Sequence, residues 1–295
     1  MWACFGLGAL GRWSGAFPAG SAAALNRFVI AVALPALVLV HAREIPLTLA
    51  GAAPALAPWI TLAVGVAVVE AVGRARGWPR RTVGALALTA GLSNTSFVGF
   101  AVVSALLGPE ALPTALVLDQ LGSFLAVSTA GVVLAAWYAG GAVSARTLAG
   151  RILAFPPFGA LALGLLTRGL ALPPPLVEIL ERLADTMVPL AIFSLGLLLD
   201  VSPAGMRRSA GPLGVGLGYK LAIAPLLAWI GLSAVGAADG LPGRVIVLET
   251  AMAPMVTGGI LAADHGLDPE LAARMVGVGL LISLVTVPAI SALLG

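Results

Sequence analysis

The sequence predicts an all-α, polytopic membrane protein with about ten transmembrane helices, arranged as two inverted repeats of five. Three observations predict this fold class. Of the 295 residues, 60% are apolar and only 10% are charged, whereas about a quarter of the residues of a soluble protein are charged. Apolar blocks of membrane-spanning length follow one another along the chain. Two of these blocks carry polar or glycine-rich interruptions that lie 160 positions apart.

The first apolar block is short, because only about eleven apolar residues precede Arg12 and a transmembrane helix needs about twenty. Arg168 occupies the equivalent place in the second half, and its block begins about seventeen residues earlier, near Arg151. The first transmembrane helix is therefore expected to be truncated. The other blocks lie near residues 23–40, 55–73, 83–107, 112–138, 151–169, 176–199, 211–235, 243–263 and 270–294.

The match at an offset of 160 positions indicates an internal duplication. It aligns Asn94 with Pro254, and it aligns the pair Pro109-Glu110 with Pro269-Glu270. Five helices per copy is an odd number, so the second copy must enter the membrane from the opposite side, which makes the repeats inverted. The predicted repeats span residues 1–138 and 151–295.

The distribution of arginines predicts a multi-pass protein of the cell membrane with both termini outside. This orientation places eleven arginines in inner loops and four in outer loops, in agreement with the positive-inside rule. The inner set is Arg12, Arg27, Arg74, Arg76, Arg80, Arg81, Arg146, Arg151, Arg207, Arg208 and Arg274, and the outer set is Arg43, Arg168, Arg182 and Arg244. The run from Arg74 to Arg81 is the main expected cytoplasmic anchor.

The two interruptions are the candidate binding site. The first puts four polar side chains in succession, from Ser93 to Ser96, inside an apolar block. Such side chains are tolerated at membrane depth where they face protein, water or a ligand, or where they satisfy backbone groups freed by a helix break. Paired broken helices are the best sequence pointer to a transporter site. The predicted substrate-binding residues are Asn94, Thr95, Ser96, Pro254, Thr257 and Gly258.

Four polar residues inside other apolar segments are candidates for coupling or gating: Asp119, Gln120, Lys220 and Glu249. An ionised carboxylate near the middle of a transmembrane helix costs at least a few kcal/mol, so Asp119 either titrates with transport or accepts fixed hydrogen bonds. Lys220 is the only lysine. It could pair with a carboxylate or attract an anion, or its side chain could extend to the membrane interface. Glu249 could instead lie at an aqueous entrance.

Several classes of function are disfavoured. Cys4 is the only cysteine, so neither an intrachain disulfide nor a cysteine-based metal site can form. The sequence contains no phosphate-binding loop, no paired histidines and no Ser/His/Asp set at membrane depth, and we therefore expect neither an enzyme nor a bound metal or cofactor. The arginines do not form a basic stripe with interleaved aromatic residues, so no nucleic-acid partner is expected.

The two interruptions resemble those of a known family. Asn94-Thr95 followed by Gly99, and then the segment from Gly108 to Leu112, resemble the fourth-span region of the auxin efflux carrier family. Leu248–Met252 and Gly266–Ala272, with a last span rich in Ser and Thr, are similar to the ninth and tenth spans of that family. Further segments similar to its second and seventh spans are residues 26–35 and 189–196.

This resemblance implies a fold similar to that of sodium/bile-acid symporters and sodium/proton antiporters. Scaffold and transport subdomains would be interleaved across both repeats, and broken helices 4 and 9 would cross. The resemblance implies an organic anion bound near the crossing, at Asn94 and the break around Pro254. Two departures from the family pattern are Ala101, where relatives have a proline, and the displacement of the second proline by one place to Pro254.

The expected function is that of a secondary transporter that exports a small organic anion by alternating access. One alternative is a sodium-coupled symporter for organic anions on the same architecture, and another is a membrane sensor that binds a ligand without moving it. The expected partners are a small carboxylate substrate, the lipid bilayer and, as an option, a second copy of the chain.

Overall fold

The computed structural model describes residues 2–18, 20–45, 48–141, 144–198 and 203–294. These residues form helices and their connections, without a β-strand. Five segments of the described chain are helical, long and apolar enough to cross a membrane: Ser21–His41, Ala53–Arg76, Pro109–Ala139, Met206–Ala234 and Pro269–Leu294. Two shorter apolar helices are Thr95–Leu107 and Pro156–Leu166. The all-α membrane class is confirmed. The end of one predicted block at residue 199 and the end of the predicted second repeat at residue 295 lie outside the described residues.

The first half of the chain contains the following helices: α1 (Trp2–Ser14), α2 (Ser21–Phe28), η1 (Val29–Ala33), α3 (Leu34–His41), η2 (Ala42–Glu44), α4 (Leu49–Ala52), η3 (Ala53–Ala55), α5 (Leu56–Arg76), α6 (Arg80–Gly91), η4 (Thr95–Gly99), α7 (Phe100–Leu107), η5 (Pro109–Ala111), α8 (Leu112–Val117), η6 (Leu118–Phe124), η7 (Val127–Gly131) and α9 (Val132–Ala139). The long helix α5 ends where Gly77 takes a left-handed conformation, at φ 63°, which is a common helix terminator.

The second half contains the following helices: α10 (Ala145–Leu153), α11 (Pro156–Leu166), α12 (Pro174–Asp185), α13 (Met187–Leu198), α14 (Pro203–Gly218), η8 (Tyr219–Ile223), α15 (Ala224–Ala234), α16 (Leu241–Ala251), α17 (Val256–Asp264) and α18 (Pro269–Leu294).

Polar residues inside the apolar segments lie on wide, π-helical turns. Thr95 and Ser96 belong to η4, Asp119 and Gln120 to η6, and Lys220 to η8, and all three turns are π-helical. A π-helical turn leaves carbonyl groups differently placed from those of an α-helix, and such turns are frequent at functional sites. The local backbone thus marks the same segments that the polar side chains mark.

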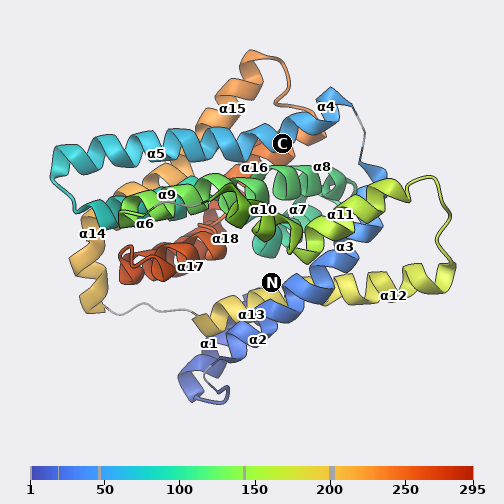
Figure 1. Ribbon diagram of the computed structural model, residues 1–295, viewed down its shortest axis with the longest axis horizontal. Helices are drawn as coiled ribbons and strands as arrows, with labels where there is room; N and C mark the ends of the chain where they lie inside the picture. The colour runs from blue at the N-terminus through green and yellow to red at the C-terminus, as the bar shows by residue number, and fades with distance from the viewer. Residues whose placement is uncertain (1, 19, 46–47, 142–143, 199–202, 295) are drawn as a thin grey trace.

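The helices form two groups that are visible in Figure 1. In one group, α1 and α2 pack on α13, and α11 and α12 pack on α3. In the other, α6 contacts α5, α9, α17 and α18, and α14 packs on α18. The turn η4 and helices α7 and α8 lie between the groups, because η4 contacts α13 and α8 contacts α3.

Small residues allow α1 to lie close against α13. A Cβ atom added to Gly8 would overlap the carbonyl oxygen of Phe193, and one added to Gly196 would overlap the carbonyl oxygen of Phe5. Close approach of backbones at glycine is the usual way in which membrane helices gain contact area. Arg12, at the end of α1, donates to the carbonyl of Leu197 at 3.0 Å, which satisfies one of the unpaired carbonyls at the end of α13.

Candidate functional site

Two helices stop and restart at the predicted interruptions. Helix α6 ends at Gly91 and η4 begins at Thr95, while α16 ends at Ala251 and α17 begins at Val256. The backbone between the ends is extended: Leu92 has φ −116° and ψ 134°. Each break leaves backbone N–H and C=O groups without intrahelical partners, so both need partners elsewhere.

The two breaks supply those partners to each other. The amide of Asn94 donates to the carbonyl of Ala253 at 2.8 Å, and the amide of Met255 donates to the carbonyl of Leu92 at 3.0 Å. Between these bonds Ser93 lies opposite Pro254 in an isolated antiparallel bridge. Because this central pair exchanges no hydrogen bond of its own, a proline, which has no N–H, fits there. The partner of Pro254 is Ser93, one place before the residue that the 160-residue offset predicts.

Asn94 caps the restarting helix and keeps a free donor. Its side-chain oxygen accepts from the amide of Phe97 at 3.3 Å. Its Nδ2 group is buried and has no hydrogen-bond partner among the described residues. A buried donor without a partner costs about 1–3 kcal/mol. Asn94 is therefore a position at which a ligand acceptor would be stabilising.

Asp119 ties the restarting helix to the neighbouring span. The hydroxyls of Thr95 and Ser96 both donate to its Oδ1 atom, the latter at 2.6 Å, and Gln120 Nε2 donates to Oδ2 at 2.7 Å. The carboxylate is 1% exposed. It also lies near the N-terminal end of η4, where negative charge is favoured. These bonds are the fixed arrangement that the sequence leaves open, and they occupy Thr95 and Ser96.

Lys220 reaches the crossing from a third element, η8. Its side chain is 0% exposed, so it does not extend to the surface. Its ammonium donates to the hydroxyl of Ser93 and, at 2.8 Å, to the carbonyl of Thr250. Ser93 lies in the first break and Thr250 in the last turn of α16, so one ammonium joins both interrupted helices.

Glu249 is the unpartnered acid of this site. It is 0% exposed, so it does not lie at an aqueous entrance, and both of its carboxylate oxygens lack a hydrogen-bond partner among the described residues. The carboxylate occupies the space beside Gly99, where an added Cβ atom would lie 2.8 Å from Oε1. Gly99 is therefore needed to make room for the acid. A buried carboxylate without donors requires a proton, a cation or water.

The residues of the second break have different surroundings. The ring of Pro254 packs against Gly279 of α18. Gly258 packs against α6, because a Cβ atom added to Gly258 would lie 2.7 Å from the carbonyl oxygen of Leu88. Thr257 is exposed, whereas its neighbours Val256 and Gly258 are buried. Adjacent helical residues point about 100° apart, so the side that faces α6 excludes Thr257. The structure therefore places the Thr257 side chain on a different side of α17 from the one that packs on α6, and its role in substrate binding stays a prediction.

Three contributors to the site were not among the predicted site residues: Ser93, Thr250 and Gly99. Ser93 opens the polar run of the first interruption, so the sequence carried a signal for it. Thr250 acts through its backbone carbonyl, which no side-chain pattern reveals. Gly99 was noted only as part of a motif, and its role depends on Glu249, which is 150 positions away in the chain.

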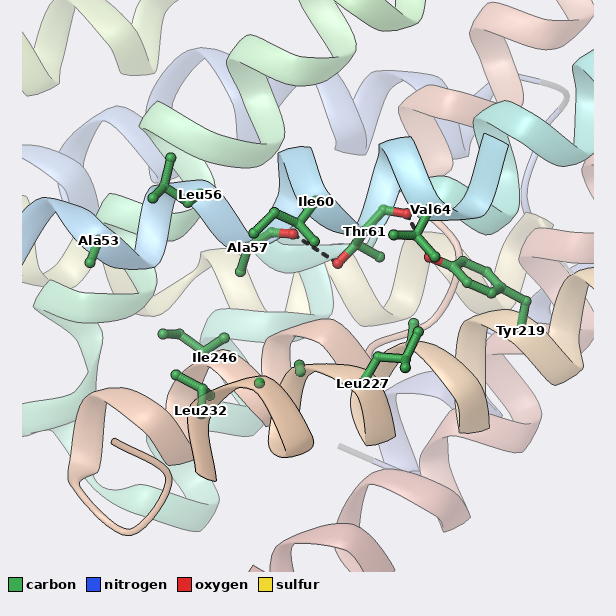
Figure 2. A pocket seen from close by; sticks show the side chains of 13 residues that line it. Ala53, Leu56, Ala57, Ile60, Thr61, Val64, Tyr219, Leu227, Leu232 and Ile246 are labelled. Atoms are coloured by element: carbon green, nitrogen blue, oxygen red, sulfur yellow. Dashed lines mark hydrogen bonds between the residues drawn. The ribbon is translucent and has the colours of Figure 1, made fainter. Parts of the chain in front are cut away.

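Two cavities in the described part of the chain have linings that do not include the polar residues of this crossing. One is a groove of about 350 Å³ between α5 and α15. Figure 2 shows its apolar lining, which includes Leu56, Ile60 and Leu227. At its end Tyr219 donates to the carbonyl of Thr61 at 2.6 Å. The described residues that line this groove include no charged group. A cavity of about 40 Å³ next to Met252 is large enough only for water.

Comparison with known proteins places the chain among transporters. The sequence model of the family described as "Membrane transport protein" matches residues 2–291. An "Uncharacterized transporter" of Methanothermobacter thermautotrophicus is 31% identical over 272 residues, which cover 90% of this chain and 87% of the relative. A "Putative malonate transporter" of Rhizobium meliloti is 28% identical over 278 residues, which cover 89% of this chain and 84% of the relative.

Proposed function

The chain belongs to the membrane transport protein family, the family of the auxin efflux carriers, and on this basis we propose that it is a secondary transporter for a small organic carboxylate. We place the substrate site at the crossing of the two breaks, and we propose that alternating access exposes this site to each side of the membrane in turn. Export is the proposed direction, because an inside-negative membrane potential expels anions without a coupled ion.

The observation that carries this proposal is the unpartnered Nδ2 donor of Asn94 at the crossing. Two restarting helices, at Thr95 and Val256, begin there, and helix N-termini favour anions. The ammonium of Lys220 adds positive charge next to Asn94, through its bond to Ser93. A carboxylate that accepts from Asn94 would thus meet a donor, two positive helix ends and a cation.

The closed crossing supports a mechanism that requires movement. Asn94 is 2% exposed, and Lys220 and Glu249 are 0% exposed, so the groups of helices must shift for a substrate to reach them. We propose that the group containing α1, α3, α11 and α13 is the scaffold. The group around α6, α16, α17 and α18 would then be the mobile part that carries the two breaks.

Paired contacts support the proposed ten-helix inverted repeat. Gly8 and Arg12 of α1 correspond to Gly164 of α11 and the following Arg168, at one offset of 156 positions. Gly164 lies against the end of α3 and the start of η2, where an added Cβ atom would be 3.5 Å from the carbonyl oxygen of Leu39 and 2.8 Å from Ala42 Cβ. Arg168 donates to the carbonyl of Ile45 at 2.7 Å, as Arg12 donates to the carbonyl of Leu197. Leu197 directly follows Gly196, the glycine of α13 that lies against α1. Each copy thus packs its first helix in the same manner.

The crossing itself has the local two-fold symmetry of an antiparallel bridge, as an inverted duplication requires at this point. An offset of 161 positions carries Asn94 to Met255 and Leu92 to Ala253. Under this operation the bond from Asn94 to Ala253 becomes the bond from Met255 to Leu92, and both bonds are present. The one-place change from 160 accounts for the opposition of Ser93 and Pro254 instead of Asn94 and Pro254.

The relative from Rhizobium meliloti, a "Putative malonate transporter", suggests dicarboxylates as the first substrates to test. We propose flux measurements in proteoliposomes under an imposed potential, with labelled mono- and dicarboxylates that include malonate. Asn94→Ala should reduce flux about 10-fold to 100-fold, because a hydrogen bond to a charged group contributes about 1.5–3 kcal/mol. Thr257→Ala is the control: because Thr257 is exposed while its neighbours on α17 are buried, we propose that it lies outside the site and that its replacement leaves flux unchanged.

Two results would count against the proposal. If Asn94→Ala transports a substrate as fast as the parent, the site lies elsewhere in the fold. If a carboxylate binds to the parent in detergent but crosses no liposome membrane under a potential of either sign, the sensor alternative is favoured over the transporter.

A further inference from the structure

The buried ammonium of Lys220 has the surroundings of a bound metal cation. It is the only lysine of the chain, it is 0% exposed, and it extends from the π-helical turn η8 to the two breaks. Burying an ammonium costs several kcal/mol unless oxygen atoms surround it. The identity of its neighbours therefore indicates what the position is built to hold.

The two direct neighbours are oxygen atoms at the ends of interrupted helices. The ammonium donates to the hydroxyl of Ser93 and to the carbonyl of Thr250, the latter at 2.8 Å. Thr250 is the penultimate residue of α16, and carbonyls at a helix C-terminus lack intrahelical partners and carry partial negative charge. In broken-helix transporters, carbonyls of this kind coordinate sodium ions or protons.

Two acidic residues lie next in sequence to, or bind the neighbours of, the residues that hold the ammonium. Glu249 on α16 directly precedes Thr250, and both of its buried oxygens lack partners among the described residues. Asp119 on η6 is bound by Thr95, Ser96 and Gln120. The ion pairs in the described part of the chain include neither acid and do not include Lys220. The crossing thus combines hydroxyl, carbonyl and carboxylate oxygens with one buried amino group.

We propose that the ammonium of Lys220 takes the place of an alkali-metal cation at the crossing, so that the carrier needs no sodium ion. The second part of this inference, that transport needs no sodium ion, rests on the proposed transport function. Ammonium and sodium carry the same charge and use the same oxygen atoms. Because Lys220 already lies within hydrogen-bond distance of Ser93 and Thr250, a sodium ion cannot bind those oxygens while the lysine is in place.

The test is the thermal stability of the purified full chain in sodium chloride and in choline chloride at equal ionic strength. The parent should unfold at the same temperature in both salts. Lys220→Met keeps much of the side-chain stem but removes the charge, so it should unfold at a lower temperature in choline and recover several degrees in sodium. A ligand that binds only the folded state raises stability in proportion to the logarithm of its concentration, so the recovery should grow with sodium concentration.

Arg274→Met is the matched control. Arg274 is a second largely buried cation, which donates to Ser209 at 2.7 Å and to Glu270 at 2.7 Å away from the crossing. Its loss should lower the unfolding temperature equally in both salts.

The proposal is overturned if sodium stabilises the parent, or if Lys220→Met is equally unstable in both salts. If Lys220→Met yields no folded protein, Lys220→Ala is purified in each salt. Folded protein obtained only with sodium supports the proposal, whereas folded protein obtained in both salts or in neither contradicts it. Thermal unfolding requires no substrate, so these outcomes stay separate from the success or failure of the flux measurement.

Discussion

At the residue scale, the two acids of the crossing have opposite surroundings. Asp119 receives three hydrogen bonds, so it is fully used in holding η4 against the neighbouring span. Glu249 receives none from the described residues. A group that exchanges a proton or contacts a ligand must have free acceptor atoms. Of the two acids, Glu249 is therefore the better candidate for a coupling role, and Asp119 is the better candidate for a structural one.

The closeness of Gly99 and Glu249 gives a prediction at this scale. Gly99→Ala should lower the unfolding temperature, because the new methyl group would overlap the carboxylate of Glu249. Glu249→Ala removes the obstacle, so the double variant should lose less stability than the sum of the single variants. The measurement is a double-mutant cycle by thermal or chemical unfolding, with an expected coupling of about 1 kcal/mol or more. Additive effects would show that the two residues do not share this space.

The residue scale also shows what the sequence could predict. The polar run beginning at Ser93 located the first break because such residues need a reason to lie at membrane depth. The partners of Lys220 could not be predicted, since Ser93 is 127 positions away and Thr250 contributes only its backbone. The direction of the Thr257 side chain could not be predicted either, because a break interrupts the helical phase, so the periodicity before the break says nothing about the direction of side chains after it.

At the scale of helices, the first break forms without the expected proline. Ala101 lies buried inside α7, and the interruption falls earlier, between Gly91 and Thr95. Gly91 lies against Leu62 of α5, where an added Cβ atom would be 2.7 Å from Leu62 Cδ1. The side chain of Asn94 then caps the next turn, as a helix N-cap residue does. Packing and capping replace the proline.

The contact of α1 with α13 gives a prediction for this scale. Gly8→Ala should destabilise the protein by about 1–3 kcal/mol, because its methyl group would overlap the backbone of α13 and overpacking has costs of this size. Gly6→Ala is the control, since an atom added at Gly6 meets nothing within 4 Å. It should be neutral or stabilising by up to about 1 kcal/mol. Equal unfolding temperatures for the two variants would contradict the close contact.

At the scale of the whole molecule, the sequence predicted the fold class and the family, because both depend on features spread along the entire chain. Apolar blocks and two matching interruptions suffice for that purpose. The packing of the helices into two groups could not be predicted from the sequence. It depends on contacts such as that of α1 with α13, which join the first and seventh predicted spans and leave no pattern within either segment.

The proposed orientation gives a prediction for the whole molecule. Cys4 is the only cysteine, so a Cys4→Ser background permits site-specific labelling. Arg76→Cys, at the exposed end of α5, should react with a membrane-impermeant maleimide in inverted vesicles but not in intact cells. Arg182→Cys should show the reverse, because it lies in a predicted outer segment and the arginine is largely exposed. Reversal of both results would show that the orientation in the membrane is opposite to the predicted one.

The single buried lysine also gives the protein a chemical reporter. Reagents that acylate amines have one side-chain target in the entire chain, and that target is enclosed while Ser93 and Thr250 hold it. Acylation of Lys220 can proceed only in molecules whose two breaks have separated. The modified fraction, read by mass spectrometry of the native sequence, would therefore record how often the crossing opens, without any added probe.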